Sequence, residues 1–323
     1  MNLESRRPYR VVATCSTMPR RYDVLQKSIE GLLNQTVKLD AIYITLPKKS
    51  RRLGIEYPPL PEYITKHCKV VHLEEDYGPV TKILGGLLAE EKDPNTVIIS
   101  FDDDTIFDKN FVEVIIKYHE KHPKACICAT GALIRRGFFP YWTIISSLKP
   151  FHLIKGFTGF DLKKHNHRCD LVFGVGGVLY TRGMFPSNKD LYDEFIHYAM
   201  EDDALFHNDD VLISSYLSSK DVDRLVFLDI PSVTLVSGND ALSSDFLKSS
   251  ERTHQSIKVA KDLGLYKHIE PMTMMETPVT KGALGAIAII LLIIVAYVVY
   301  KYYLMEPPKE ITSLINQIAY VDL

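Results

Sequence analysis

Val97-Ile98-Ile99-Ser100-Phe101-Asp102-Asp103-Asp104 is an apolar run that ends in three consecutive carboxylates. The apolar half predicts a buried strand, and helical patterns flank it on both sides, as they do in parallel sheets. Open α/β sheets bind ligands at the carboxyl ends of their strands, where these acids would lie. Adjacent negative charges repel one another unless protons or a cation relieve them. The stretch predicts a ligand site; the structural alternative is an acidic turn in which Asp103 or Asp104 caps the next helix.

A hard divalent ion is the cation that three neighbouring carboxylates favour. Mn2+ and Mg2+ take oxygen ligands, and Mg2+ is commonly held by one or two carboxylates together with substrate phosphates. The acidic run therefore predicts a substrate that carries a nucleotide.

Composition restricts the other classes of function. The chain of 323 residues is 24% charged and 46% hydrophobic, as in globular proteins. A formal net charge of -2 without a dominant basic stripe argues against nucleic acid as a partner. Five cysteines at irregular spacing predict reduced core residues instead of a disulfide framework.

Strand and helix patterns alternate along the first part of the chain. Expected strands cover residues 10–15, 41–46, 70–73 and 97–101, with helices after the first, third and fourth of them. This alternation predicts an α/β domain with a doubly wound, mostly parallel sheet. Residues 131–164 are rich in aromatic side chains without a clear period, so they predict either a cover over a substrate site or a core beneath a long loop.

A second acidic cluster follows, formed by Glu201-Asp202-Asp203 and Asp209-Asp210. Acids at the start of a helix are stabilised by its dipole, so capping is the structural alternative for Asp209. A carboxylate that faces a phosphate site could instead act as a general base toward a hydroxyl group.

The C-terminal part predicts a membrane anchor. No charged residue lies between Gly282 and Tyr300, and about 20 apolar residues suffice to cross a bilayer. We expect a domain at 1–270, a linker at 271–281, a transmembrane helix at 282–304 and a tail at 305–323. Because no signal peptide is recognisable at the N-terminus, a single-pass anchor with the large domain in the cytosol is expected.

The order of these motifs resembles the inverting family 2 glycosyltransferases, which have the glycosyltransferase-A fold. The resemblance covers roughly residues 10–217. The segments that carry it are Val11-Val12-Ala13-Thr14 with Pro19-Arg20-Arg21, Asp76-Tyr77-Gly78-Pro79-Val80-Thr81-Lys82, Phe101-Asp102-Asp103-Asp104, Gly176-Gly177-Val178-Leu179-Tyr180 with Arg182, and Asp209-Asp210-Val211-Leu212-Ile213-Ser214.

The resemblance implies a transfer of one sugar from a nucleoside diphosphate sugar, a UDP-sugar, to a hydroxyl of a glycan, protein or lipid-linked acceptor. It implies Asp210 as general base with Asp209 as the alternative, and Asp104 and Asp102 as ligands of Mn2+ or Mg2+. The implied donor-binding residues are Thr14, Ser16, Pro19, Arg20, Asp76, Gly78, Lys82, Asp102 and Asp103. The implied acceptor-side or sugar-side residues are Gly176, Gly177 and Arg182.

One departure and two alternatives accompany this hypothesis. The Q-x-x-R-W motif of processive synthases is absent from the sequence, which favours transfer of a single sugar. The same acidic residues on an α/β sheet would also suit a metal-dependent nucleotidyltransferase or phosphohydrolase. A membrane-anchored protein that binds nucleotide sugars without turnover is the non-enzymatic alternative.

Overall fold

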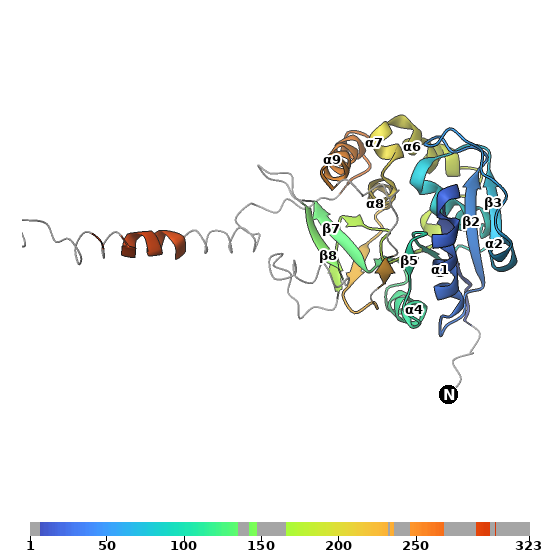
Figure 1. Cartoon of the computed structure of the whole chain (residues 1–323), viewed down its shortest axis with the longest axis horizontal. Coiled ribbons are helices and arrows are strands. Elements are labelled where there is room, and N and C mark those ends of the chain that lie inside the picture. Colours follow the sequence, from blue (N-terminus) through green and yellow to red (C-terminus); the bar gives the residue numbers. More distant parts are fainter. Residues whose placement is uncertain are drawn as a thin grey trace, which may run out of the picture. The chain divides into compact units, whose positions relative to one another are not determined.

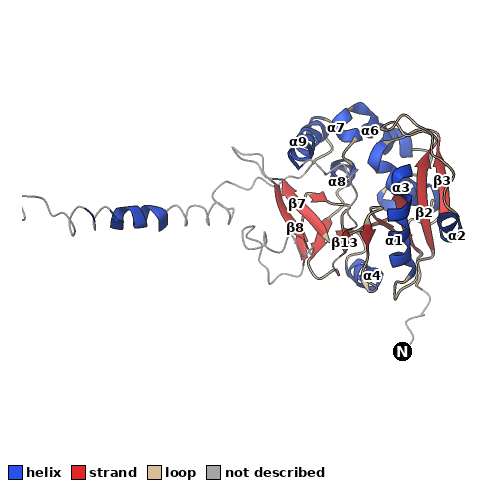
Figure 2. Ribbon diagram, in the orientation of Figure 1, coloured by secondary structure: helices blue, strands red, loops and turns tan. Residues whose placement is uncertain are grey.

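The structure is a computed structural model that describes residues 7–134, 142–146, 166–231, 233–235, 246–267, 289–297 and 301. The chain divides into two compact units. The first comprises Met1–Gly156 and Asp161–Pro271, and the second comprises Phe157–Phe160 and Met272–Leu323. The sheet, drawn in Figures 1 and 2, belongs to the first unit, and so do the residues of both acidic clusters.

An eight-stranded sheet in the described part of the chain has the order β3-β2-β1-β4-β11-β6-β12-β9. The first four strands in this order are parallel to one another, whereas β11 runs antiparallel to both β4 and β6. Strand β6 is parallel to β12, and β9 closes the sheet in the antiparallel direction. The strands are β1 Val11–Ser16, β2 Ala41–Pro47, β3 Lys69–Leu73, β4 Val97–Ser100, β6 Cys126–Cys128, β9 Asn166–Arg168, β11 Val178–Thr181 and β12 Arg224–Phe227.

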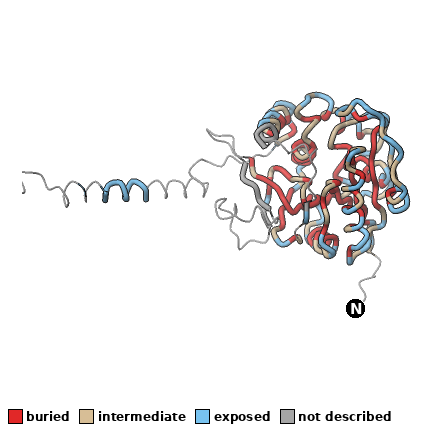
Figure 3. Tube along the Cα trace, in the orientation of Figure 1, coloured by how far each residue is buried: buried red, intermediate tan, exposed pale blue. Residues whose placement is uncertain are grey.

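Helices cover both faces of this sheet because the side chains of each strand alternate between the faces. One set of buried strand residues, which includes Val11 and Ile99, shares a core with α1 Tyr22–Leu33 and α4 Phe111–Lys121. The opposite set faces α3 Thr81–Ala89, where the glycine at position 86 lets the helix lie against Thr14 and Ile98. The central strands are therefore buried along most of their length (Figure 3).

The remaining elements of the first unit complete the layers around the sheet. Helix α8 is buried on most of its circumference, and Asn208 caps its first turn by accepting a hydrogen bond from the backbone N–H of Val211. The other elements are α2 Glu62–His67, α6 His197–Glu201, α7 Asp203–Phe206, α8 Asp209–Ser219, α9 Phe246–Asp262, the π-helix Tyr192–Ile196, and the short strands β5 Thr105–Ile106, β7 Thr130–Ile134, β8 Trp142–Ser146, β10 Leu171–Val172 and β13 Thr234–Leu235.

The predicted α/β class with a mostly parallel sheet is confirmed. The glycine-rich run Phe173-Gly174-Val175-Gly176-Gly177-Val178-Leu179-Tyr180 has a strand-like sequence, but the strand begins only at Val178, because residues 173–177 form the turn that precedes it. All five cysteines are buried thiols. Of the aromatic segment 131–164, β7 and β8 are described and the rest lies outside the described residues.

The predicted membrane anchor is described only in part. Among the residues that the structure describes, no helix is long and apolar enough to cross a membrane. Of the span 282–304, the structure describes residues 289–297 as a helix, together with residue 301. The linker 271–281, the tail 305–323 and the other residues of the span lie outside the described part.

Candidate active site

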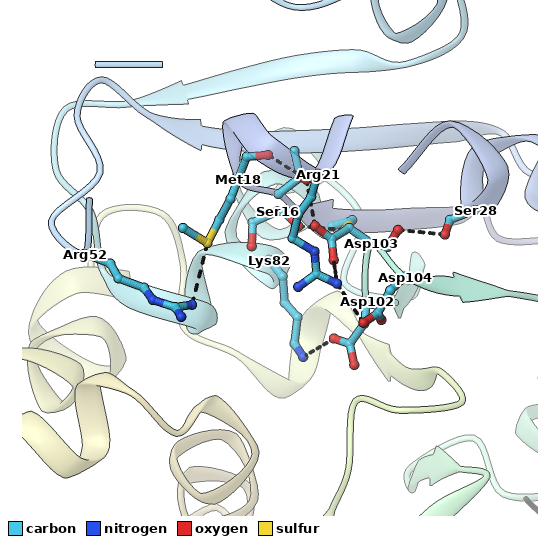
Figure 4. Close-up of polar contacts among 11 residues, drawn as sticks. Ser16, Met18, Arg21, Ser28, Arg52, Lys82, Asp102, Asp103 and Asp104 are labelled. Atoms are coloured by element: carbon cyan, nitrogen blue, oxygen red, sulfur yellow. Dashed lines mark hydrogen bonds and ion pairs between the residues drawn. The ribbon is translucent and has the colours of Figure 1, made fainter. Parts of the chain in front are cut away.

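Lys82 lies between the two acidic clusters that the sequence predicted. Its ammonium group is 2.8 Å from Oδ1 of Asp102 and 2.7 Å from Oδ2 of Asp209 (Figure 4 shows the pair with Asp102). The side chain of Lys82 is buried, and so is that of Asp209. One cation therefore joins the carboxyl edge of β4 to the N-terminus of α8, although the two carboxylates are far apart in the sequence.

Thr14 fixes the helix that carries this lysine. The buried hydroxyl of Thr14 donates to the backbone carbonyl of Lys82 at 2.7 Å and accepts from the backbone N–H of Gly86 at 3.2 Å. Strand β1 thereby holds the first turn of α3 against the sheet. Thr14, which the family resemblance assigned to the donor, uses its hydroxyl for this internal contact.

The charge of Lys82 depends on its two partners. Burial by itself lowers the pKa of the ammonium group, but the carboxylates of Asp102 and Asp209 outweigh it and keep the pKa well above the usual value. The lysine is therefore a permanent cation in the site at neutral pH.

Gly174 is the contact point between Lys82 and the second acidic cluster. Its backbone N–H donates to Oδ1 of Asp210 at 2.9 Å. A Cβ atom at this position would overlap Nζ of Lys82 and would lie 3.2 Å from Oδ1 of Asp102. Only glycine leaves this space to the ammonium group. The sequence signal was the glycine-rich run, from which Gly176 and Gly177 were selected and Gly174 was missed.

Arg21 neutralises the other two acids of the first cluster. Its Nη2 atom is 2.9 Å from Oδ1 of Asp103 and 2.6 Å from Oδ2 of Asp104 (Figure 4). Arg20, which the resemblance assigned to the donor, is exposed instead. The residues Pro19–Arg21 form a 3-10 turn, and its geometry directs Arg21 to the acids.

Asp103 is held in place by further contacts. Its Oδ2 accepts a hydrogen bond from the hydroxyl of Thr17 at 2.7 Å, and its backbone carbonyl accepts one from Ser28 at 2.9 Å. Burial raises the pKa of Asp103 to about 6, while Arg21 and Thr17 act in the opposite direction. Asp103 is thus engaged by the protein, whereas Asp102 and Asp104 keep 33% and 23% of their side-chain surface exposed to a ligand.

Asp210 has the protonation behaviour of a base that works near neutral pH. Burial is the main cause that raises the pKa of Asp210 to about 8, and the charge of Asp209 acts in the same direction. Lys82 and the N–H of Gly174 lower it. The pKa of Asp210 therefore lies in the range where proton acceptors in enzymes operate.

The segment between β3 and α3 is built around Asp76 and Gly78. Asp76 accepts hydrogen bonds from the backbone N–H groups of Gly78 and Arg51, both at 2.8 Å. Gly78 has a φ of +72°, and a Cβ atom there would overlap the backbone carbonyl of Phe206. These two residues shape the turn and its packing on α7. Ser16, at the end of β1, lies within the group of polar residues drawn in Figure 4.

The three residues expected on the acceptor side do not lie together. Gly176 and Gly177 have positive φ values in the turn before β11, and a Cβ atom on Gly177 would lie 2.6 Å from the ring of Phe111. Arg182 follows the other end of β11. Because β11 is antiparallel to β4, with Val178 opposite Ser100, that end lies at the edge of the sheet away from the acids.

Arg182 has a different set of contacts from the one expected, which corrects its assignment to the acceptor side. Its buried guanidinium group donates to the carbonyl of Leu87 at 2.8 Å and to that of Phe185 at 3.1 Å. The carbonyls in the last turn of a helix lack partners within the helix, so Arg182 stabilises the C-terminal end of α3.

A divalent cation fits this site only together with further ligands. Among the described residues, no group of three histidine, cysteine or carboxylate side chains is arranged to hold a metal ion. Asp102 and Asp104 are each partly exposed and each engage one basic side chain. Mg2+ is usually bound by one or two carboxylates together with the phosphate oxygens of a nucleotide. Asp102 and Asp104 could supply the carboxylates of such a site, with the phosphates supplying the other ligands.

The structure defines an open α/β domain with a cluster of paired acidic and basic side chains at the carboxyl edge of its sheet. The sequence matches Glycosyl transferase family 2 over residues 15–178, half of the chain. The chain belongs to this family, as the motifs predicted. No curated protein sequence matches it.

Among solved structures, the chain is similar to the crystal structure of GalNAc-T7 with UDP, GalNAc and Mn2+. The two share 14% sequence identity, with a TM-score of 0.45 over 78% of this chain and 48% of that one. The chain thus spans about half the length of GalNAc-T7.

Proposed function

We propose that this protein is a metal-dependent inverting glycosyltransferase that moves one sugar from a nucleoside diphosphate sugar to an acceptor hydroxyl. The observation that carries the proposal is the shared ammonium group of Lys82, which brings Asp102 of the first cluster and Asp209 of the second to within 2.8 Å of one atom. This shared contact supports one reaction site in which the two carboxylate groups have different tasks.

Asp210 is the proposed general base. The N–H of Gly174 holds its Oδ1 atom, so Oδ2 is the atom that would receive the proton of the acceptor hydroxyl. The acceptor oxygen attacks the anomeric carbon from the face opposite the diphosphate. The bond from that carbon to the diphosphate breaks, its electron pair leaves with the phosphate, and the configuration is inverted. Asp209 is the alternative base, although its Oδ2 is paired with Lys82.

Asp104 and Asp102 are the residues that would hold the divalent ion, Mn2+ or Mg2+. When bound, such an ion stabilises the negative charge of a departing diphosphate. Lys82 and Arg21 lie beside these carboxylates and would add their positive charges on the donor side. The polar residues at the ends of β1 and β4 would orient the nucleotide, because ligands of open α/β sheets bind at that edge.

Several finer features belong to the same proposal. A UDP-sugar is the proposed donor, and the acceptor is a glycan, a protein or a lipid-linked group. The C-terminal apolar residues are proposed to anchor the protein in a membrane, with the catalytic domain in the cytosol.

Release of nucleoside diphosphate tests the proposal. The purified full chain would be incubated with a panel of nucleotide sugars, Mn2+ and candidate acceptors. We expect nucleoside diphosphate from at least one donor. Release of pyrophosphate or phosphate instead would indicate a nucleotidyltransferase or phosphohydrolase, and binding of a donor without any release would indicate a protein without turnover. Either result refutes the proposed transfer.

A further inference from the structure

The basic side chains of Arg21 and Lys82 already form ion pairs with the two carboxylates that would bind the metal ion. Arg21 contacts Asp104 at 2.6 Å, and Lys82 contacts Asp102 at 2.8 Å. An incoming divalent ion therefore meets two fixed positive charges and carboxylates that have partners. Repulsion between like charges is strong in a buried, low-dielectric environment. Free metal ions should bind this site weakly.

A nucleotide changes the balance of charges. Its diphosphate arrives with the metal ion and carries negative charge. Lys82 can therefore pair with a phosphate oxygen when it leaves Asp102. The ammonium group of lysine is a compact charge on a flexible four-carbon stem and is a common phosphate ligand. Lys82 is thus able to exchange a carboxylate for a phosphate oxygen by rotation about its side-chain bonds.

We propose that Lys82 holds the place of the metal ion in the free protein: its ammonium group occupies Asp102 and Asp209 until a metal–nucleotide complex arrives and draws it to the diphosphate. The inference rests on the proposed function, and it adds that metal binding depends on nucleotide. It also implies an order, because Asp209 is released from Lys82 only when the donor is present.

Gly174 makes the proposal testable without removal of any charge. A Cβ atom at this position would overlap Nζ of Lys82, which is the mobile end of a flexible side chain, and would lie 3.2 Å from Oδ1 of Asp102, which would have to shift by only a few tenths of an ångström. The φ of Gly174 does not lie in the left-handed region in which side chains are strained. Gly174→Ala should therefore fold normally and push the ammonium group away from Asp102. Its backbone N–H remains available to Asp210.

The full chain would be titrated with Mn2+ alone and with Mn2+ in the presence of UDP. Binding would be measured by calorimetry or from the electron paramagnetic resonance signal of free Mn2+. In the wild type, UDP should strengthen Mn2+ binding at least tenfold, which is about 1.4 kcal/mol. Gly174→Ala and Lys82→Met should both bind Mn2+ alone at least tenfold more tightly than the wild type.

Two matched variants serve as controls. Gly31→Ala adds a methyl group on α1, where its nearest neighbours would lie at 3.4 to 3.6 Å, an ordinary van der Waals contact. Lys220→Met removes an exposed lysine that pairs with Glu194 at 2.9 Å. Both should bind Mn2+ as the wild type does. Folding of every variant would be checked by circular dichroism and thermal unfolding.

The inference is wrong if folded Gly174→Ala binds Mn2+ alone no more tightly than the wild type. Lys82→Met adds a second test, but if it fails to fold the alanine variant decides alone. This comparison needs no nucleotide, so its result is independent of the proposed function. If UDP binds and sugar is transferred while Gly174→Ala shows no gain in Mn2+ affinity, only the role of Lys82 is refuted. If the gain is seen without any transfer, only the proposed function is refuted.

Discussion

The raised pKa of Asp210 predicts how the reaction depends on pH. A general base acts in its ionised form, so activity should be lost as pH falls through the pKa of about 8. With that pKa, about one hundredth of the Asp210 carboxylates are ionised at pH 6 and about nine tenths at pH 9. The value of kcat/KM should therefore rise roughly 90-fold between pH 6 and pH 9. An aspartate at its usual pKa of 3.8 would give a flat profile over this range.

The assay is release of nucleoside diphosphate at subsaturating acceptor, measured across this pH range with a donor that supports turnover. The midpoint of the profile reports the ionisation of Asp210 in the free enzyme. Asp203→Asn is the control, since this acid is 83% exposed on its side chain and should leave the profile unchanged. A profile that is flat from pH 6 to pH 9 would refute the assignment of the base.

Three further substitutions test separate parts of the structure. In a denaturant titration, Gly78→Ala should lower the free energy of unfolding by about 2 kcal/mol or more, since its Cβ would overlap the Phe206 carbonyl. Gly54→Ala is the control: this glycine has a φ of +68° but open space around it, so the substitution should cost about 1 kcal/mol. Arg182→Met should cost about 2 to 3 kcal/mol in that titration because it removes the donor to the Leu87 carbonyl of α3 and to the Phe185 carbonyl, and an acceptor KM that rose while stability held would contradict this role. Asp104→Asn should weaken UDP binding in the presence of Mn2+ about tenfold or more in calorimetry, and unchanged affinity would exclude Asp104 from the metal site.

The sequence predicted the parts of the fold that local patterns encode. The apolar run before Asp102, the periodic helices and their alternation sufficed for an α/β class with a mostly parallel sheet. The two acidic clusters were also visible, because a carboxylate cluster after a buried strand is unusual. Their meeting at one lysine could not be derived, since it depends on where the tertiary fold places the first turn of α8 relative to Lys82.

Other site residues depended on tertiary geometry. Arg21 and Arg20 are neighbours in sequence, and only the phase of the 3-10 turn decides which of them meets the acids. Gly174 is needed because the ammonium group of Lys82 fills the place of its side chain. Arg182 was assigned to the wrong edge because the pattern of β11 does not reveal its antiparallel direction.

Asp102 and Asp104, after β4, and Asp209 and Asp210, at the start of α8, are proposed to form one site, in which the first pair holds the donor and Asp210 activates the acceptor. The most direct measurement compares wild type and Asp210→Asn for turnover and for UDP affinity on the same preparations. Turnover should fall about 10^2 to 10^4-fold in Asp210→Asn, while the affinity for UDP with Mn2+ is retained. Wild-type turnover in Asp210→Asn with intact UDP binding would contradict it.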